Sequence, residues 1–429
     1  MYIDINKFFE ENKINDFYKL SKLFEIEKHK LFDKSQEEWV FFTKEYVVEW
    51  MLNNLKLLKK NNIQILEPSV WSWNFIPHIV KYFSDKYKNI DLYINDIDLI
   101  SLDFIKKAIE LNILKIPNNI NIIYINKDYL KDDFSEFWRF DYIIWNPPYW
   151  KIQDNEIKKL FVNKKTNNMF SFFIEKSINI GNNISFIVPK SLLFVKQFNE
   201  NRKLLKSGIY ELSDHWKSAF DVNLETISFS YQKIDLLNHN ERDNNIIIND
   251  VINNEQLIKD KDYVFNDKFP IWLLYRNDDF DKIMSQLNIN IFKVFRDRQI
   301  TNKMLLPKWD YHCLKWKNIG INSILNIEWY DQYVNNLDWL KSADFFNKQN
   351  VLCIPNLTNN IRTCLLPENT IVNWAVALLY KHDFSEIKQS TINFINSKEF
   401  KEYFYIIKNK SNLSVNIDEN IVYFFGDLK

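Results

Sequence analysis

The sequence predicts an α/β fold with an open sheet, followed by a second, α+β domain. Short apolar runs typical of buried strands alternate with stretches of helical spacing, which is the pattern of β–α units. The chain is also long enough for two cores, with 429 residues, 46% hydrophobic and 16% aromatic. The expected strands are Ile63–Glu67, Leu92–Asn95, Asn121–Ile125, Tyr142–Ile144 and Ile184–Val188, and the expected helices are Ile76–Phe83, Leu99–Leu111 and Met169–Ile180.

The composition narrows the class of protein. No run of about 18 uninterrupted apolar residues occurs, and Met1 to Lys13 is too polar for a signal peptide. We therefore expect a cytoplasmic protein. Cys313, Cys353 and Cys364 lack the spacing of a zinc site, and their odd number suggests reduced thiols, so we expect no bound metal.

A tetrapeptide after the fourth strand carries the clearest chemistry. Asn146, Pro147, Pro148 and Tyr149 form a rigid turn that can hold a flat, amine-bearing ring. The exocyclic amine of a nucleobase is a poor nucleophile because its lone pair is delocalised into the ring. The Asn146 side-chain oxygen and the Pro147 carbonyl can accept both amine hydrogens and so aim the lone pair at an activated methyl group.

Tyr149 completes this interpretation of the turn, because it can stack on the base and contribute roughly 1–3 kcal/mol. The base must then leave its duplex, since none of these contacts is possible inside the stack. The alternative is a plain surface turn in a chain that is rich in Asn.

Methyl transfer needs a donor, and the ends of the preceding strands offer a site for S-adenosylmethionine. Asp96 follows the second strand, where an acidic residue can take ribose hydroxyls. Asp128 and Tyr129 follow the third. As alternatives, Asp96 and Asp98 could cap the next helix, and Asp128 could be a solvated loop carboxylate.

In this order, these motifs resemble the γ-class adenine-N6 DNA methyltransferases of restriction–modification systems, over roughly Phe41 to Tyr231. The resemblance implies a Rossmann-like, S-adenosylmethionine-dependent methyltransferase sheet with a C-terminal α+β target-recognition domain. Lys44 stands where the family usually has Pro. The residues that the resemblance assigns to cofactor binding are Thr43, Glu67, Pro68, Phe75, Asp96, Asp128 and Tyr129.

The resemblance also implies the reaction, a site-specific transfer of a methyl group to the N6 amine of a flipped adenine. Asn146 to Tyr149 match the family's catalytic tetrapeptide, and Phe220 matches the aromatic on the other face of the base. Phe220 could equally be a core aromatic in a chain with 35 Phe. The implied partners are double-stranded DNA and a separately encoded restriction endonuclease, since no nuclease-like cluster is evident.

The net charge is zero, which is unusual for a DNA enzyme, but the charge is uneven. Residues 151–210 hold 11 Lys and Arg against 4 acidic residues, and residues 291–320 hold 7 against 2. Both could be ordinary solvated faces. The candidate DNA contacts are Lys151, Lys158, Lys159, Lys164 and Lys165 after the tetrapeptide, and Arg296, Arg298, Lys303, Lys308 and Lys315 further on.

We expect four segments. Residues 1–40 form a helical extension, 41–235 the catalytic domain, 236–262 a linker that is rich in Asn, Asp and Ile, and 263–429 the target-recognition domain. The last assignment rests on analogy with the family, because this part of the chain shows no motif.

Glycine is scarce where a nucleotide-binding loop needs it. The chain has 4 Gly and 14 Trp, whereas ordinary usage predicts roughly 30 Gly. Tryptophan instead occupies glycine-like positions: Trp71 and Trp73 after Pro68, Trp145 and Trp150 around the tetrapeptide, Trp216, and Trp374. We hypothesise that these codons are UGA, translated here as Trp although the source reads them as Gly.

Three other functions fit parts of the pattern. If Trp71 and Trp73 are native, they fill the donor's place, and the chain is a catalytically inactive methyltransferase-fold DNA-binding protein. A cytosine-amine DNA methyltransferase uses similar geometry, but Ser more often replaces the Asn. A glutamine-amide protein methyltransferase shares the turn, but such enzymes resemble shorter chains without a large C-terminal domain.

Overall fold

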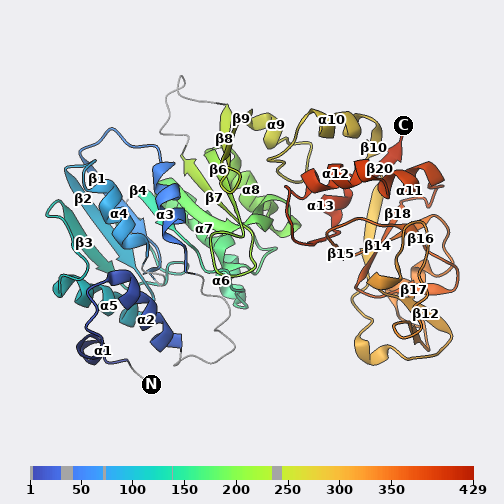
Figure 1. Cartoon of the computed structure of the whole chain (residues 1–429), viewed down its shortest axis with the longest axis horizontal. Helices are drawn as coiled ribbons and strands as arrows, with labels where there is room; N and C mark the ends of the chain where they lie inside the picture. The colour runs from blue at the N-terminus through green and yellow to red at the C-terminus, as the bar shows by residue number, and fades with distance from the viewer. Residues whose placement is uncertain (1–2, 30–41, 71–73, 138, 234–243) are drawn as a thin grey trace. The chain divides into compact units, whose positions relative to one another are not determined.

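The computed structural model describes residues 3–29, 42–70, 74–137, 139–233 and 244–429. The chain divides into two compact units (Figure 1). Unit 1 comprises Met1–Leu192 and Gln197–Lys261, and unit 2 comprises Leu193–Lys196 and Asp262–Lys429.

Unit 1 is built on a nine-stranded mixed sheet in the order β3-β2-β1-β4-β5-β7-β6-β8-β9. The first five of these strands run parallel, and β7 lies antiparallel between β5 and β6. The strands are β1 Asn62–Glu67, β2 Asn89–Asn95, β3 Ile120–Ile125, β4 Phe140–Trp145, β5 Gly181–Pro189, β6 Ile209–Trp216, β7 Thr226–Gln232, β8 Asn245–Asp250 and β9 Glu255–Asp260. The predicted α/β fold is therefore confirmed.

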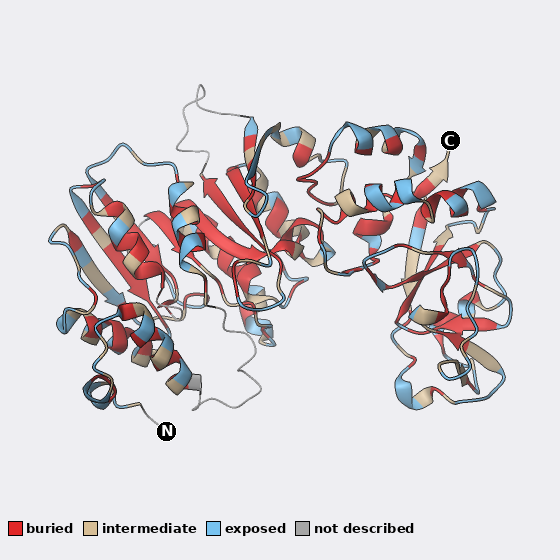
Figure 2. Ribbon diagram, viewed as in Figure 1, coloured by how far each residue is buried: buried red, intermediate tan, exposed pale blue. Residues whose placement is uncertain are grey.

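Helices connect and cover these strands, whose central members are buried throughout (Figure 2). α3 packs on α4, and α7 packs on α8. The connection β1-α4-β2 runs toward the β3 edge of the sheet, whereas β4-α7-β5 runs in the opposite direction. Because both crossovers are right-handed, α4 and α7 lie on opposite faces of the sheet. The helices are α1 Ile5–Glu11, α2 Phe17–His29, α3 Glu45–Asn53, α4 Phe75–Phe83, α5 Leu99–Glu110, α6 Asn155–Lys159, α7 Met169–Ile180 and α8 Asn199–Lys206.

The strand order reverses between β1 and β4, which is the topological switch point of the sheet. In open α/β sheets, a crevice for ligands forms there, beyond the carboxyl ends of the strands. The tetrapeptide Asn146 to Tyr149 follows β4 directly, so the fold places it at this crevice.

The expectation of a linker over 236–262 is wrong for the part that the structure describes. β8 pairs parallel with β6, and β9 pairs antiparallel with β8, so both strands extend the sheet. Ile246 and Ile248 supply the buried face of β8, and the Asn249 amide donates to the Glu211 carboxylate at 3.0 Å. The Asn and Asp residues around the run Ile246 to Ile248 resemble those of a linker, but Asn249 and Asp250 are buried in the sheet.

Unit 2 is an α+β assembly of small sheets. A four-stranded sheet has the order β11-β18-β14-β16, and a three-stranded sheet has the order β13-β12-β17. The strands are β10 Leu287–Ile289, β11 Phe292–Arg296, β12 Tyr311–Leu314, β13 Gln332–Val334, β14 Val351–Pro355, β15 Leu357–Thr358, β16 Cys364–Leu365, β17 Thr370–Val372, β18 Val376–Lys381, β19 Val415–Asn416 and β20 Gly426–Leu428. The helices are α9 Lys261–Val264, α10 Asp278–Ser285, α11 Gln389–Ile395, α12 Lys398–Ile407 and α13 Glu419–Val422.

The core of unit 2 contains the three cysteines, all buried as free thiols. Within the described ranges, no helix is long and apolar enough to cross a membrane.

Candidate active site

The loops after β1, β2, β3 and β4 enclose a cavity of about 240 Å³, here called the first cavity. Each loop contributes residues that the sequence had singled out, so the four strand ends that were expected to meet do meet. Its lining includes Pro68, Ser69, Asn95, Asp96, Ile97, Asp128, Tyr129, Trp145, Asn146, Pro147, Pro148, Trp150 and Phe173.

Asn95, at the end of β2, ties three of these loops together. Its Nδ2 donates to the carbonyl oxygens of Pro68 at 2.8 Å and Lys127 at 3.1 Å, and its Oδ1 accepts from the Lys127 backbone N–H at 3.1 Å. The sequence analysis missed this residue, because an Asn at a strand end gives no signal of which loops it will reach.

Asp96 lies at the wall of the first cavity and does not cap α5. The helix cap is Asp98, whose carboxylate accepts from the Ile100 N–H at 3.1 Å. The Asp96 carboxylate accepts from the Asp98 N–H at 2.9 Å and the Ser69 hydroxyl at 3.2 Å. Burial raises the pKa of Asp96 to about 6, although these hydrogen bonds oppose the shift. Ile97, the next residue, lines the cavity with 69% of its surface exposed. Its side chain is an apolar surface that a flat ligand could cover.

Glu67, the last residue of β1, is completely buried. Among the described residues, neither of its carboxylate oxygens has a hydrogen-bond partner. Burial, and then the neighbouring Asp96, raise the pKa of Glu67 well above its usual range. An unpartnered buried carboxyl group is costly, and a cationic ligand group such as the ammonium of S-adenosylmethionine would relieve the cost. The chemistry of this carboxyl group suits that cofactor, although Glu67 itself is not part of the first cavity's lining.

Thr43 has a role that the sequence did not reveal. Its Oγ1 accepts a hydrogen bond of 3.0 Å from Nδ2 of Asn146, and its backbone carbonyl accepts one from the Asn74 amide. Thr43 is completely buried and is not part of the first cavity's lining. It positions Asn146, whereas the resemblance had assigned it to the cofactor.

The tetrapeptide separates the first cavity from a second cavity of about 330 Å³. Tyr149 lines the second cavity, together with Asn168, Phe170, Pro189, Phe198 and Leu224. Its hydroxyl donates to the Ile187 carbonyl at 3.0 Å, so the ring is held in place. Phe220 lies edge-on to Tyr149, with centroids 6.1 Å apart and planes at 71°. The two rings are neighbours, but they do not form a parallel slot, and Phe220 is not part of the second cavity's lining.

Of the other residues predicted to bind the cofactor, some line the first cavity and others do not. Tyr129 lines the first cavity, donates to or accepts from the Ser177 hydroxyl at 2.7 Å, and stacks on Phe173. Asp128 also lines it, but Oδ1 of Asp128 accepts the Leu130 N–H at 3.0 Å within its own turn. Phe75 is buried in α4 and does not line the cavity.

The side chain of Trp145 lies in the crevice at the topological switch point. Its indole Nε1 donates to the Ser69 carbonyl at 2.6 Å, and its ring lies 4.3 Å from that of Phe173, so the side chain spans from β4 to the loop after β1. Trp150 lines the same cavity. Both indoles narrow the space that a ligand would use. Trp71 and Trp73 lie outside the described residues.

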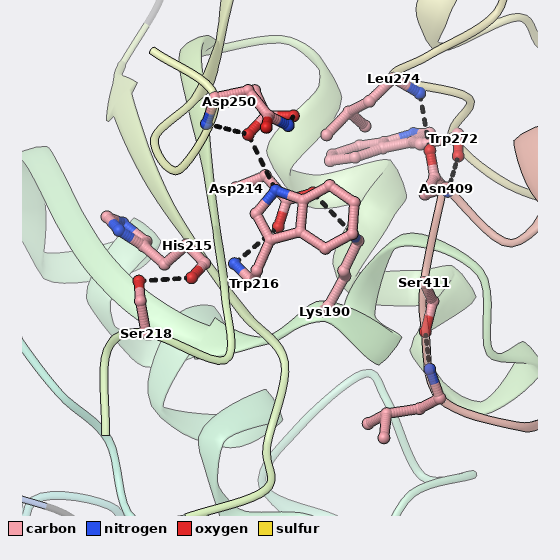
Figure 3. Close-up of polar contacts among 12 residues, drawn as sticks. Lys190, Asp214, His215, Trp216, Ser218, Asp250, Trp272, Leu274, Asn409 and Ser411 are labelled. Atoms are coloured by element: carbon pink, nitrogen blue, oxygen red, sulfur yellow. Dashed lines mark hydrogen bonds and ion pairs between the residues drawn. The ribbon is translucent and has the colours of Figure 1, made fainter. Parts of the chain in front are cut away.

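Trp216 has a backbone conformation that favours glycine. Its φ is 50°, at an irregularity where β6 passes from Asp214 to Trp216 along β7. Figure 3 shows the indole between two acidic residues: its Nε1 donates to Asp250 at 2.8 Å, and its backbone N–H donates to Asp214 at 3.0 Å. The Lys190 ammonium, which pairs with Asp214 at 2.5 Å, lies 4.5 Å from the ring. Trp374 is exposed and does not have a positive φ.

The basic candidates lie in both units. Lys151, Lys164 and Lys165 are exposed in the segment that follows the tetrapeptide, while Lys159 pairs with Glu156 at 2.6 Å. In unit 2, Arg296 and Arg298 line a third cavity of about 470 Å³. Lys303 and Lys308 are exposed, and Lys315 donates to Gln332 at 2.8 Å.

Comparison with known proteins points to one family. The model of the Eco57I restriction-modification methylase family matches residues 3–220. No curated protein matches the sequence.

Several solved structures align with this chain, and the one with a TM-score above 0.5 shares its fold. The ATP-dependent type ISP restriction-modification enzyme LlaBIII, bound to DNA, aligns with 94% of this chain and 41% of its own, at 14% identity and a TM-score of 0.51. The type IIG restriction endonuclease BpuSI aligns with 92% of this chain and 59% of its own, at 12% identity and a TM-score of 0.46. A Listeria monocytogenes protein described as a putative class I S-adenosylmethionine-dependent methyltransferase aligns with 57% of this chain and 74% of its own, at 18% identity and a TM-score of 0.44. This chain thus spans about half the length of the two restriction enzymes.

Proposed function

The chain belongs to the Eco57I restriction-modification methylase family, and from this premise we propose that it is a γ-class, site-specific DNA methyltransferase. In this proposal, it transfers a methyl group from S-adenosylmethionine to the N6 amine of an adenine that has left the DNA duplex. Unit 1 performs the chemistry, and unit 2 recognises the target sequence.

One observation carries the proposal: the tetrapeptide borders two cavities at once. Asn146, Pro147 and Pro148 line the first cavity, and Tyr149 lines the second. A methyl donor in the first cavity and a base in the second would therefore meet at Asn146. Such proximity turns an intermolecular reaction into one between held partners.

The contact with Thr43 holds the Asn146 amide in place. The amide nitrogen donates to Thr43 at 3.0 Å, so the amide oxygen is the atom directed to a substrate amine. The Asn146 oxygen and the Pro147 carbonyl hold the two amine hydrogens, and the nitrogen lone pair then points toward the first cavity. Tyr149 stacks on the base, and Phe220 turns to cover its second face.

The first cavity would hold S-adenosylmethionine, which supplies an electrophilic methyl group when bound. Glu67 would take the ammonium group, because its buried carboxyl lacks a partner in the described chain. Asp96 would take the ribose hydroxyls. Ile97, Tyr129 and Phe173 offer apolar surface to the adenine ring, and Pro68 and Asp128 complete the walls.

A second function has a specific observation in its favour. The indole of Trp145 occupies the crevice where the donor would enter. If the tryptophans around the site are native, the chain would bind DNA without catalysis. The proposed enzyme needs glycine at these positions.

The test is methyl transfer from labelled S-adenosylmethionine to plasmid DNA. It compares the chain as printed with a variant carrying Trp71→Gly, Trp73→Gly, Trp145→Gly and Trp150→Gly. The proposal expects label in DNA with the fourfold variant. Label in an added protein substrate and none in DNA would favour the glutamine-amide reaction, and no label in either would favour the non-catalytic function.

A further inference from the structure

The third cavity, in unit 2, has the composition of a site that recognises a base pair. It has a volume of about 470 Å³ and lies beside the end of β11, where Arg296, Asp297 and Arg298 follow one another. Asn356, which follows β14, also lines this cavity. All of these residues belong to unit 2.

Asp297 presents an oxygen that its surroundings do not satisfy. The residue is only 1% exposed, and its Oδ1 accepts the backbone N–H groups of Gln299 and Ile300, each at 2.8 Å. These two bonds fix the carboxylate. Its Oδ2 is buried and has no hydrogen-bond partner in the part of the chain that the structure describes. Such an oxygen is costly unless a ligand donates to it.

Asn356 presents a second acceptor of the same kind. Its Nδ2 donates to the carbonyl of Trp374 at 3.1 Å, and its backbone N–H donates to the carbonyl of Ala375 at 2.9 Å. The side chain is therefore oriented, and its buried Oδ1 has no partner among the described residues. Only the backbone carbonyl of Trp374 takes part in this bond, so the orientation of Asn356 does not depend on whether residue 374 is Trp or Gly.

The two arginines supply donors next to these acceptors. Arg298 is exposed and Arg296 is half-buried, so their guanidinium groups can reach a ligand at the rim. A phosphate alone would suit the arginines but would be repelled by the fixed carboxylate. A ligand that offers an N–H donor beside acceptors matches both sets of groups. In the DNA major groove, a C·G pair does so, through the cytosine N4 amine and the guanine O6 and N7 atoms.

We propose that this cavity reads a C·G base pair of the target site, with Asp297 accepting from cytosine N4 and Arg298 donating to guanine. Oδ1 of Asn356 accepts from the same cytosine N4 amine or from the amine of a neighbouring base. This inference rests on the proposed function for its ligand, DNA, but not on methyl transfer, since reading the sequence precedes chemistry.

The experiment is a selection of bound duplexes from a randomised DNA library with the full-length protein, followed by sequencing. The wild-type chain should enrich a motif with an invariant C·G pair. Asp297→Ala and Arg298→Ala should each lose the preference at that same pair by a factor between about five and a hundred, and leave the other positions unchanged. Glu368→Gln, which removes one exposed carboxylate of unit 2, is the matched control and should enrich the unaltered motif.

Distinct outcomes separate this inference from the proposed function. A motif that both variants leave unaltered overturns the inference, even if the protein methylates DNA. Uniformly weaker binding at every position would also overturn it, because that result indicates phosphate contacts. Thermal unfolding checks that the Asp297→Ala variant is folded. If that variant is unfolded, Arg298→Ala still tests the inference, because Arg298 is exposed. Methyl transfer to plasmid DNA is measured separately, so its failure leaves the binding result intact.

Discussion

Nδ2 of Asn146 donates to Oγ1 of Thr43 across 3.0 Å, and this bond holds the amide in place. An amide can rotate by half a turn and exchange its donor with its acceptor. In the structure the amide nitrogen faces the Thr43 hydroxyl, which leaves the amide oxygen for a substrate donor. Thr43 is itself held, since its backbone carbonyl accepts from the Asn74 side chain.

Asn146→Ala should lower kcat by at least about a hundredfold, because one acceptor for the reacting amine is lost. The affinity for S-adenosylmethionine, measured by calorimetric titration, should stay within a factor of about two to three. Thr43→Val should lower kcat by a smaller factor, since the amide remains but is no longer oriented. Asn121→Ala, at an exposed position of β3, is the control. Retained activity in Asn146→Ala would remove this residue from the mechanism.

Trp145→Gly should tighten the binding of S-adenosylmethionine by at least about tenfold. The indole spans from β4 to the Ser69 carbonyl and occupies part of the crevice, so its removal opens space for the ligand. Trp329→Gly, which alters an exposed indole of unit 2, should leave the affinity unchanged. Equal affinities for the printed chain and Trp145→Gly would show that the indole does not obstruct the site.

Trp339→Gly should raise the free energy of unfolding by about 1 kcal/mol, because a left-handed backbone strains residues other than glycine. Trp339 has a φ of 60° and is 70% exposed, so little packing is lost with its ring. Trp329 is 77% exposed and does not have a positive φ, and Trp329→Gly should give no such gain. Urea unfolding of the three proteins measures the difference.

Backbone strain at tryptophan residues also predicts which codons the gene contains. None of the four glycines has a positive φ, whereas Trp216 and Trp339 do. This strain predicts UGA at codons 216 and 339. The glycine-like positions in the sequence predict UGA at codons 71, 73, 145, 150 and 374 as well, and lower peptide masses, corresponding to glycine, in the protein from its natural source. UGG at these codons would refute the hypothesis that they encode glycine.

Glu211→Gln should stabilise the protein at pH 8 by on the order of 1–3 kcal/mol. Burial raises the pKa of Glu211 to about 7 from an ordinary value of 4.5. Between these values the folded state binds a proton that the unfolded state has lost, so the contribution of this group to stability falls as the pH rises to about 7. The neutral amide avoids this loss, and the difference in melting temperature should shrink toward pH 5. Glu255→Gln, at an exposed position of β9, should show no such pH dependence.

The sequence predicted the sheet because parallel strands with both faces covered are continuous apolar runs, as β4 is. It also located Asp96, Tyr129 and the tetrapeptide, since strand ends meet at one edge of a sheet. It could not predict the bond from Asn146 to Thr43, whose positions differ by 103 residues. The bonds from Asn95 to the two loops after β1 and β3, and the pairing of β8 with β6, likewise depend on the assembled fold.

The most direct test of the central claim is nucleoside analysis of DNA after reaction with S-adenosylmethionine and the chain carrying glycine at positions 71, 73, 145 and 150. The DNA is prepared from a host without adenine or cytosine methylation, digested, and analysed by mass spectrometry. The account predicts N6-methyladenine, absent when Asn146→Ala is added. N4-methylcytosine in its place, or N6-methyladenine that persists in Asn146→Ala, would contradict it.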